Sequence, residues 1–228
     1  MFDDLSERVC KLNKMLAAER LVTSTSGNVS GRVPDAPQHV VIKPSGVAYD
    51  EMTPDKMVVI NLEGDVVQGD LNPSVDLPNH LYLYKHKPEL MGVVHTHSNY
   101  ATAFAVLGLA IPCCCTGLAD EFGGSIPCAP YVSNEGDNIG ASIIQAMTRA
   151  PAVLCGNHGV FSFAATPERA VKAAVMCEDN ARIAYYASTL AIARGLPQPR
   201  ALPPDEIAKW WDRYHTTYGQ PGAEPDPQ

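Results

Sequence analysis

Residues 91–98 read Met-Gly-Val-Val-His-Thr-His-Ser, an apolar run that ends in two histidines. Such a run is typical of a buried strand. Side chains at positions i and i+2 of a strand point to the same face of a sheet. We therefore predict that His95 and His97 lie side by side where this strand ends.

A third histidine follows a second apolar run, at residues 152–155. His158 stands in the sequence Gly-Asn-His-Gly, which is typical of a turn. If the two strands are neighbours, His158 completes a set of three imidazoles, the ligand number of a catalytic Zn²⁺ site that keeps one position open. A lone His-x-His pair is more often a packing feature, but the third histidine favours one zinc ion per chain.

Two acidic residues, Asp76 and Asp120, stand in stretches rich in Gly, Pro and Ser on either side of the histidine pair. Most aspartates in loops are caps or surface residues. A carboxylate beside a divalent cation can instead be a ligand or a proton-transfer group. Both residues are therefore candidates for the same site.

Three loop pairs could bind an anion: Gly27-Asn28, Ser45-Gly46 and Pro73-Ser74. Consecutive backbone N–H groups in such turns, together with a polar side chain, can surround a phosphate. Each pair taken singly is an ordinary turn, and none carries a Walker or dinucleotide-binding motif.

The bulk composition limits the class of protein. The chain has 228 residues, 46% of them apolar, and a formal charge of −8. This length fits one α/β domain, and the charge argues against a nucleic-acid or membrane partner. We expect a cytoplasmic protein, because there is no signal-like N-terminus and no apolar stretch of membrane-spanning length. The seven cysteines form no C-x-x-C pair and suit reduced thiols.

The pattern of apolar residues predicts helices and strands in irregular alternation, hence a layered α/β domain over residues 1–220. The three prolines of residues 221–228 predict a disordered tail. We predict loops or irregular structure at 23–28 and 109–136. The predicted helices cover 3–19, 78–87, 98–107, 138–149, 166–195 and 204–214, and the predicted strands cover 39–43, 56–61, 66–67, 91–95, 152–155 and 160–164.

Several of these motifs together resemble the class II aldolase/adducin superfamily, and within it the L-ribulose-5-phosphate 4-epimerases. The resemblance extends over about residues 4–220. It rests on T-S-G-N-V-S (25–30), V-I-K-P-S-G-V (41–47), V-V-H-T-H-S (93–98), G-N-H-G-V-F (156–161) and Y-G-Q (218–220).

The resemblance implies a three-layer α/β/α sandwich around a mostly antiparallel sheet, assembled as a homotetramer with active sites at subunit interfaces. It implies that His95, His97 and His158 hold zinc with Asp76 beside the metal, where the aldolases typically have Glu. Asp120 and Tyr218 match the two acid/base residues. The positions that match the phosphate site are Gly27, Asn28, Lys43, Ser45, Gly46 and Ser74.

The implied activity is zinc-dependent interconversion of L-ribulose 5-phosphate and D-xylulose 5-phosphate by retro-aldol and aldol steps. The alternatives are a class II sugar-phosphate aldolase, a sugar-acid phosphate decarboxylase and a non-catalytic adducin-like module. The complete histidine set argues against the module, which needs no metal. The sequence departs from the epimerase pattern at Val75, where a second phosphate-binding serine is expected, and in a shorter segment between Asp120 and His158.

Overall fold

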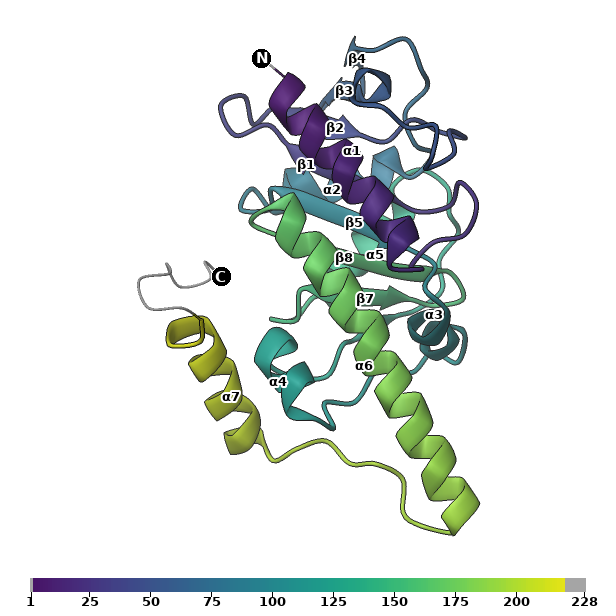
Figure 1. Ribbon diagram of the computed structural model, residues 1–228, viewed down its shortest axis with the longest axis vertical. Helices are drawn as coiled ribbons and strands as arrows, with labels where there is room; N and C mark the ends of the chain where they lie inside the picture. Colours follow the sequence, from purple (N-terminus) through teal and green to yellow (C-terminus); the bar gives the residue numbers. More distant parts are fainter. Residues whose placement is uncertain (1, 220–228) are drawn as a thin grey trace.

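An eight-stranded sheet with the order β4-β3-β2-β1-β5-β8-β7-β6 runs through the computed structural model, which describes residues 2–219 (Figure 1). Neighbouring strands are antiparallel except β6 and β7, which are parallel. The strands are β1 (Asn28–Arg32), β2 (His39–Ile42), β3 (Val58–Asn61), β4 (Val66–Gln68), β5 (Gly92–Thr96), β6 (Cys128–Ala129), β7 (Ala152–Cys155) and β8 (Gly159–Ala164).

Helices cover both faces of this sheet, so the expected three-layer α/β/α sandwich is confirmed. Helices α2 and α5 pack on one face, and α1, α3, α4 and α6 pack on the other. The helices are α1 (Asp3–Ala18), α2 (Leu77–His86), α3 (Asn99–Val106), α4 (Thr116–Phe122), α5 (Asn138–Ala146), α6 (Pro167–Arg194) and α7 (Pro204–Thr216), with a short 3-10 turn, η1, at Pro54–Lys56.

The alternation of side chains along β5 sets the two layers of the core. Val93 packs with α2 and α5, whereas Val94 packs with α1 and α6. His95 follows with the same parity as Val93, and its neighbour across the β5–β8 ladder is Phe161, which belongs to the α2/α5 layer. The predicted strand therefore forms, and its first histidine points to the face that α2 covers.

Some elements differ from the sequence prediction. Strand β1 (Asn28–Arg32) begins at the last residue of the predicted polar loop at 23–28, and no strand was predicted there. The region 109–136 is not irregular throughout, because it contains α4 and β6. Asp120 is thus a helical residue and not a loop residue. The predicted strand at 56–61 starts later, at Val58, because Pro54 begins the 3-10 turn η1.

Helix ends follow local chemistry in one case and tertiary contacts in another. Thr166 caps α6 as predicted, with its Oγ1 accepting a hydrogen bond from the Arg169 N–H at 3.2 Å. The predicted cap Ser98 makes no such bond. Instead the Glu178 carboxylate of α6 accepts hydrogen bonds from the N–H groups of Tyr100 and Ala101, at 3.0 and 2.9 Å. A carboxylate from a helix distant in the sequence therefore caps the N-terminus of α3 in place of Ser98.

Three further points concern membrane-spanning helices, the end of the chain and the cysteines. No helix among residues 2–219 is long and apolar enough to cross a membrane. Residues 221–228, predicted to be a disordered tail, lie outside the described residues. All seven cysteines are free thiols, as their spacing predicted.

Candidate metal centre and associated sites

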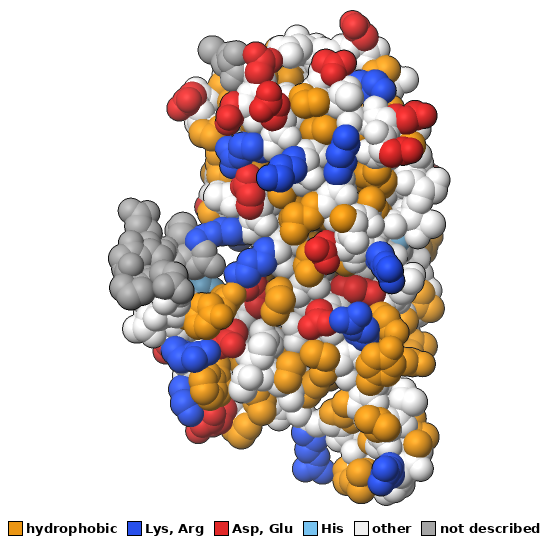
Figure 2. Space-filling view, viewed as in Figure 1, with side chains coloured by type: hydrophobic (Ala, Val, Ile, Leu, Met, Phe, Trp, Pro, Cys, Tyr) orange, Lys and Arg blue, Asp and Glu red, His pale blue; other side chains and the backbone are white. Residues whose placement is uncertain are grey.

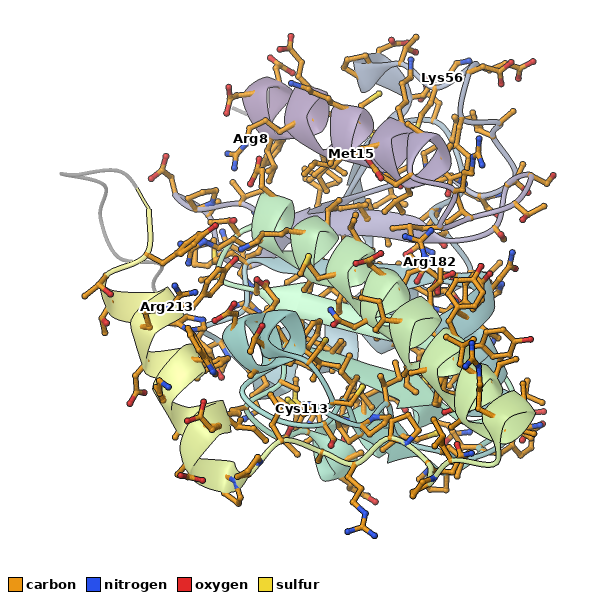
Figure 3. All side chains as sticks on the ribbon, turned by 60° about the horizontal axis from the view of Figure 1, so that its bottom comes forward. Arg8, Met15, Lys56, Cys113, Arg182 and Arg213 are labelled. Atoms are coloured by element: carbon orange, nitrogen blue, oxygen red, sulfur yellow. The ribbon has the colours of Figure 1, made fainter. Side chains whose placement is uncertain are left out.

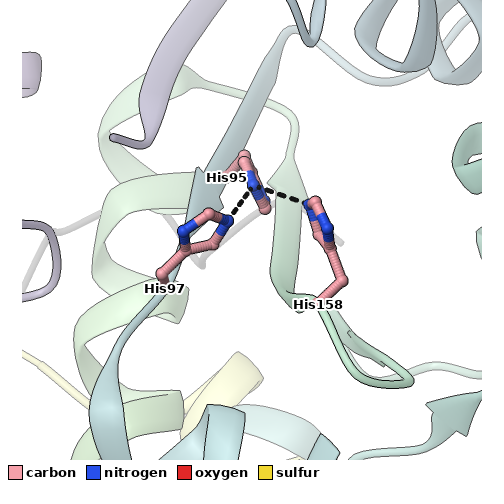
Figure 4. A group of neighbouring side chains, drawn as sticks. All are labelled: His95, His97 and His158. Atoms are coloured by element: carbon pink, nitrogen blue, oxygen red, sulfur yellow. Dashed lines mark hydrogen bonds between the residues drawn. The ribbon is translucent and has the colours of Figure 1, made fainter. Parts of the chain in front are cut away.

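Three histidines converge where β5 ends and β8 begins (Figure 4). The Nε2 atom of His95 lies 2.9 Å from that of His97 and 3.1 Å from that of His158. A tetrahedral zinc ion with bonds of about 2.0–2.1 Å to nitrogen implies nitrogen–nitrogen separations of roughly 3.3 Å. The donor set therefore fits a divalent ion such as zinc, and the sequence-predicted triad is brought together.

The backbone around the triad explains how the turn at His158 comes this close to β5. Asn157 has a φ of 55°, which places the turn in the left-handed region. The next residue is Gly159, and a Cβ atom there would lie 2.5 Å from the Thr96 carbonyl oxygen and 2.7 Å from the His97 ring. A side chain at position 159 would thus push the turn, and His158 with it, away from the strand.

The protonation of the triad suits metal binding. Burial lowers the pKa of His95 to about 3, and burial also lowers the pKa of His97 and His158. All three rings are therefore neutral near pH 7, as ligands must be. The Val160 carbonyl oxygen lies 3.0 Å from His95 Nδ1. It fixes the proton on Nδ1 and leaves the Nε2 lone pair directed at the centre of the triad.

Asp76 lies beside the triad but is not one of its converging ligands within the described residues. It stands just before α2, and its Oδ2 accepts a hydrogen bond from Asn28 Nδ2 at 2.7 Å. Burial raises the pKa of the Asp76 carboxyl, but the nearby His95 and His80 and the Asn28 amide outweigh it and lower the pKa overall. Near neutral pH an ionised carboxylate thus stands next to the three neutral imidazoles.

Two of the predicted phosphate-binding residues, Gly27 and Ser74, adjoin Asn28, which the pairing of β1 with β5 sets opposite His95. Asn28 Nδ2 also donates to Ser74 Oγ at 2.9 Å. Gly27 has a φ of +75°, and a Cβ there would lie 2.9 Å from the His95 carbonyl oxygen. Glycine is therefore required for the loop to approach β5 so closely.

The loop of Lys43, Ser45 and Gly46 is joined to the loop of Ser74 by backbone hydrogen bonds. Ser74 N–H donates to the Lys43 carbonyl, and Ser45 N–H donates to the Asn72 carbonyl. Lys43 Nζ is buried, donates to the Thr25 carbonyl at 3.0 Å, and has a pKa that burial lowers. Ser45 and Gly46 are exposed, and space around Gly46 is open. The two joined loops thus carry the Lys43 ammonium group and the Ser45 and Ser74 hydroxyl groups, whereas the Ser45 and Ser74 N–H groups are used within the backbone.

Asp120 and Tyr218 do not lie at the triad in the single chain. Asp120 is on α4 and Tyr218 follows α7, and both contact Arg213 of α7. A cavity of about 440 Å³ opens on this side, lined by α4 and α7 and by residues that follow β8 and precede β5. The triad stands at the other ends of the same two strands. The structure thus separates the predicted acid/base pair from the predicted metal site.

Sequence reasoning missed three residues that shape these sites. Phe161 stacks on His95 with ring centroids 4.3 Å apart, Val160 supplies the carbonyl that orients His95, and Arg213 joins Asp120 to Tyr218. Phe161 could have been found, because it follows His158 in the motif used for the resemblance. The other two contacts depend on strand register and helix packing, which leave no local signal.

Three converging histidines that could hold a metal, on a mostly antiparallel α/β/α sandwich, are the arrangement of a metal-dependent enzyme. The sequence matches the family of the class II aldolase and adducin N-terminal domain over residues 7–185. The chain therefore belongs to the class II aldolase/adducin family and is an enzyme of that family.

Solved structures agree with this assignment. L-fuculose 1-phosphate aldolase superposes with a TM-score of 0.82 and is 26% identical, covering 92% of this chain and 96% of its own. YgbL from Klebsiella pneumoniae, a candidate aldolase, epimerase or decarboxylase, gives 0.75 at 25% identity, covering 91% and 97%. An aldolase II superfamily protein from Pseudomonas syringae shares the fold, with a TM-score of 0.81 at 18% identity over 96% of this chain and 87% of its own.

Proposed function

We propose that this protein is a zinc-dependent, cytoplasmic epimerase that interconverts L-ribulose 5-phosphate and D-xylulose 5-phosphate. The C3–C4 bond of the sugar breaks in a retro-aldol step, and the three-carbon fragment retains the bond electrons. The glycolaldehyde phosphate fragment turns its other face and adds again, which inverts C4. Both fragments stay bound between the two steps, and this distinguishes an epimerase from an aldolase.

In this proposal the metal held by the triad polarises the substrate, and the residues around the triad bind it. Zn²⁺ held by His95, His97 and His158 supplies a Lewis acid for the ketone end of the sugar. Asp76 and the Asn28 amide form the adjacent polar wall. Asn28, Lys43, Ser45 and Ser74 offer donors to the phosphate, together with the backbone of Gly27 and Gly46. Binding of the phosphate orients the carbon chain of the sugar over the triad.

The observation that carries the epimerase proposal is the pairing of Asp120 and Tyr218 around Arg213. Inversion at C4 needs one group to take the hydroxyl proton on one face and another to return it on the opposite face. Two proton-transfer groups of different chemistry, brought together from α4 and from the end of α7, meet this need. Asp76, shorter than the glutamate typical of the aldolases, is consistent with the same reading.

These two groups would reach a triad only in an assembly, so we propose a homotetramer with shared active sites. Apolar side chains gather over the C-terminal half of α6 (Figure 2) and at the end of α3, close to the triad. Among them Tyr186 is 51%, Leu190 62% and Leu107 70% exposed. Exposed apolar surface of this kind marks an interface. A second copy docked on this side could bring its Asp120 and Tyr218 to the triad.

A class II sugar-phosphate aldolase is the second candidate. It is favoured by the 26% identity to L-fuculose 1-phosphate aldolase over almost the full length of both chains. The two candidates differ in their substrates and in the fate of the fragments. The aldolase would release two products, whereas the epimerase returns a single ketose phosphate.

The test is to incubate the zinc-loaded protein separately with L-ribulose 5-phosphate and with L-fuculose 1-phosphate, and to follow the products by NMR. We expect D-xylulose 5-phosphate from the first and no turnover of the second. Release of dihydroxyacetone and glycolaldehyde phosphate, or cleavage of the fuculose substrate, would reject the epimerase in favour of an aldolase.

A complementation test addresses the shared site. Two inactive variants, His97→Ala and Tyr218→Phe, are co-expressed so that they form mixed tetramers. If each site takes its triad from one chain and its tyrosine from a neighbour, about a quarter of the sites in an equal mixture pair an intact triad with an intact tyrosine. Recovery of activity toward that level supports the proposal, and no recovery would show that each site lies within one chain.

A further inference from the structure

Arg213 contacts both proposed acid/base groups. Its Nη2 lies 3.6 Å from Asp120 Oδ1, and its Cζ lies 5.5 Å from the centre of the Tyr218 ring. Figure 3 shows Arg213 on the side of α7 that faces α4. Neither contact is part of the metal or phosphate sites.

The Asp120 carboxylate depends on this contact. Its Oδ1 atom is buried and makes no hydrogen bond within residues 2–219. A buried carboxylate oxygen without a hydrogen bond is costly unless a cation stands nearby. Arg213 supplies that charge from a neighbouring helix, since α4 and α7 pack against each other. The direction of the Asp120 side chain is therefore tied to the guanidinium group.

Tyr218 is held to the same residue in two ways. The Arg213 carbonyl accepts the N–H groups of Thr217 and Tyr218, each at 3.0 Å, which closes the end of α7. The guanidinium group also lies near the Tyr218 ring, whose centroid is 4.9 Å from that of the Tyr214 ring. A planar cation can bind a carboxylate along its edge and an aromatic ring on its face at once.

We propose that Arg213 is a positioning residue of the reaction, holding Asp120 and Tyr218 in one fixed arrangement for transfer of the two protons. This inference rests on the proposed epimerase function. The guanidinium group acts through the two side chains and need not touch the sugar. Lysine would keep the charge but lose the planar group that serves both contacts.

The chain offers a matched control at Lys209, another exposed cation of α7. Its Nζ stands 4.8 Å from the Trp210 ring, as Arg213 stands 4.7 Å from the same ring. Lys209 is paired with Glu206 at 3.2 Å and forms no ion pair or ring contact with Asp120 or Tyr218 among the described residues. Removing its charge therefore perturbs the same helix and the same indole without touching the proposed pair.

The experiment compares Arg213→Gln, Arg213→Lys and Lys209→Gln in the full zinc-loaded protein with L-ribulose 5-phosphate. A loss of orientation costs on the order of 10²-fold in rate, so we expect Arg213→Gln to lower kcat by about that factor with KM and zinc content unchanged. Arg213→Lys should recover part of kcat, and Lys209→Gln should match the wild type. In an Asp120→Asn background, Arg213→Gln should cost much less. A wild-type kcat in Arg213→Gln, or an equal loss in Lys209→Gln, would overturn the proposal.

Hydrogen exchange at residues 214–218 separates this proposal from the proposed function. Arg213→Gln should speed exchange there and Lys209→Gln should not, whatever the substrate. If the wild type fails to epimerise while exchange responds as expected, the proposed function is rejected and the link through Arg213 stands. If the wild type epimerises and neither kcat nor exchange responds, Arg213 has no positioning role.

Discussion

The two ends of strands β5 and β8 differ in how complete they are within one chain. At one end three neutral imidazoles already converge, held by strand pairing, a glycine turn and a backbone carbonyl. At the other end Asp120 and Tyr218 gather around Arg213, no metal-ligand cluster is found there among residues 2–219, and Tyr218 is 63% exposed. In our proposal the first end binds the metal, and the second contacts a neighbouring subunit. The predictions below test this division, from the largest expected effect to the smallest.

Substitution of a histidine of the triad should have the largest effect on zinc binding and turnover. His97→Ala removes one of the three ligands, so we expect zinc to be lost and turnover to fall roughly 10⁴-fold or more, since a Lewis acid contributes several kcal/mol. Zinc content by elemental analysis and kcat measure the two effects together. His86→Ala is the control, because His86 is exposed and bonds only to the Tyr82 carbonyl among the described residues. A metal-free His97→Ala variant with normal turnover would remove the triad from the mechanism.

Substitutions at the α4/α7 end should lower turnover without loss of zinc. Asp120→Asn and Tyr218→Phe each remove one proton-transfer group, which typically contributes about 10²–10⁴-fold. Both variants should keep zinc, because neither residue contacts the triad in the described chain. The measurement compares epimerisation with release of the fragments, and we expect release to gain relative to epimerisation when one proton transfer fails. Loss of zinc in either variant would contradict the division between the two ends.

The metal-free protein should lose stability in acid because two imidazoles, those of His80 and His95, are buried on the side of the sheet that holds the triad. Burial lowers the pKa of His80 to about 4 and that of His95 to about 3, against about 6.5 in the unfolded chain. Below pH 6.5 the unfolded chain binds protons that the folded chain does not. The free energy of unfolding should therefore fall with decreasing pH, by up to about 1.4 kcal/mol per pH unit for each group.

Urea unfolding of the metal-free protein between pH 7.5 and 5 measures this slope. His80→Gln should reduce it, since one of the two buried imidazoles is then absent. Zinc should oppose the effect by binding only the folded triad. A stability that does not change over this range would show that these imidazoles are not shielded from protons.

The smallest effect concerns the phosphate loop. Val75 is 76% exposed beside Ser74, where the resemblance to the epimerases predicts a second serine. Val75→Ser should lower KM by roughly 5-fold, because one added hydrogen bond contributes about 1 kcal/mol. Val67→Ser, at an exposed position of β4, is the control. An unchanged or higher KM would mean that this loop does not bind the phosphate.

Sequence patterns were most informative where the relevant geometry is local. The His-x-His pair lies on one face because alternation along a strand is fixed by the backbone, and Thr166 caps α6 through its own side chain. The sequence patterns were least informative at 109–136. Helix α4 in this region has only seven residues and is stabilised by packing of Leu118 and Phe122 against distant segments. A helix that short has almost no intrinsic stability.

By itself, the amino-acid sequence determined the strands that carry the histidines, the free thiols and membership in the class II aldolase/adducin family. Only the tertiary structure decided that Asn28 lies opposite His95, that Val160 orients His95, and that Arg213 joins Asp120 to Tyr218. The physical reason is distance along the chain. Periodicity and capping act over a few residues, whereas these contacts join segments that meet only through strand register and helix packing.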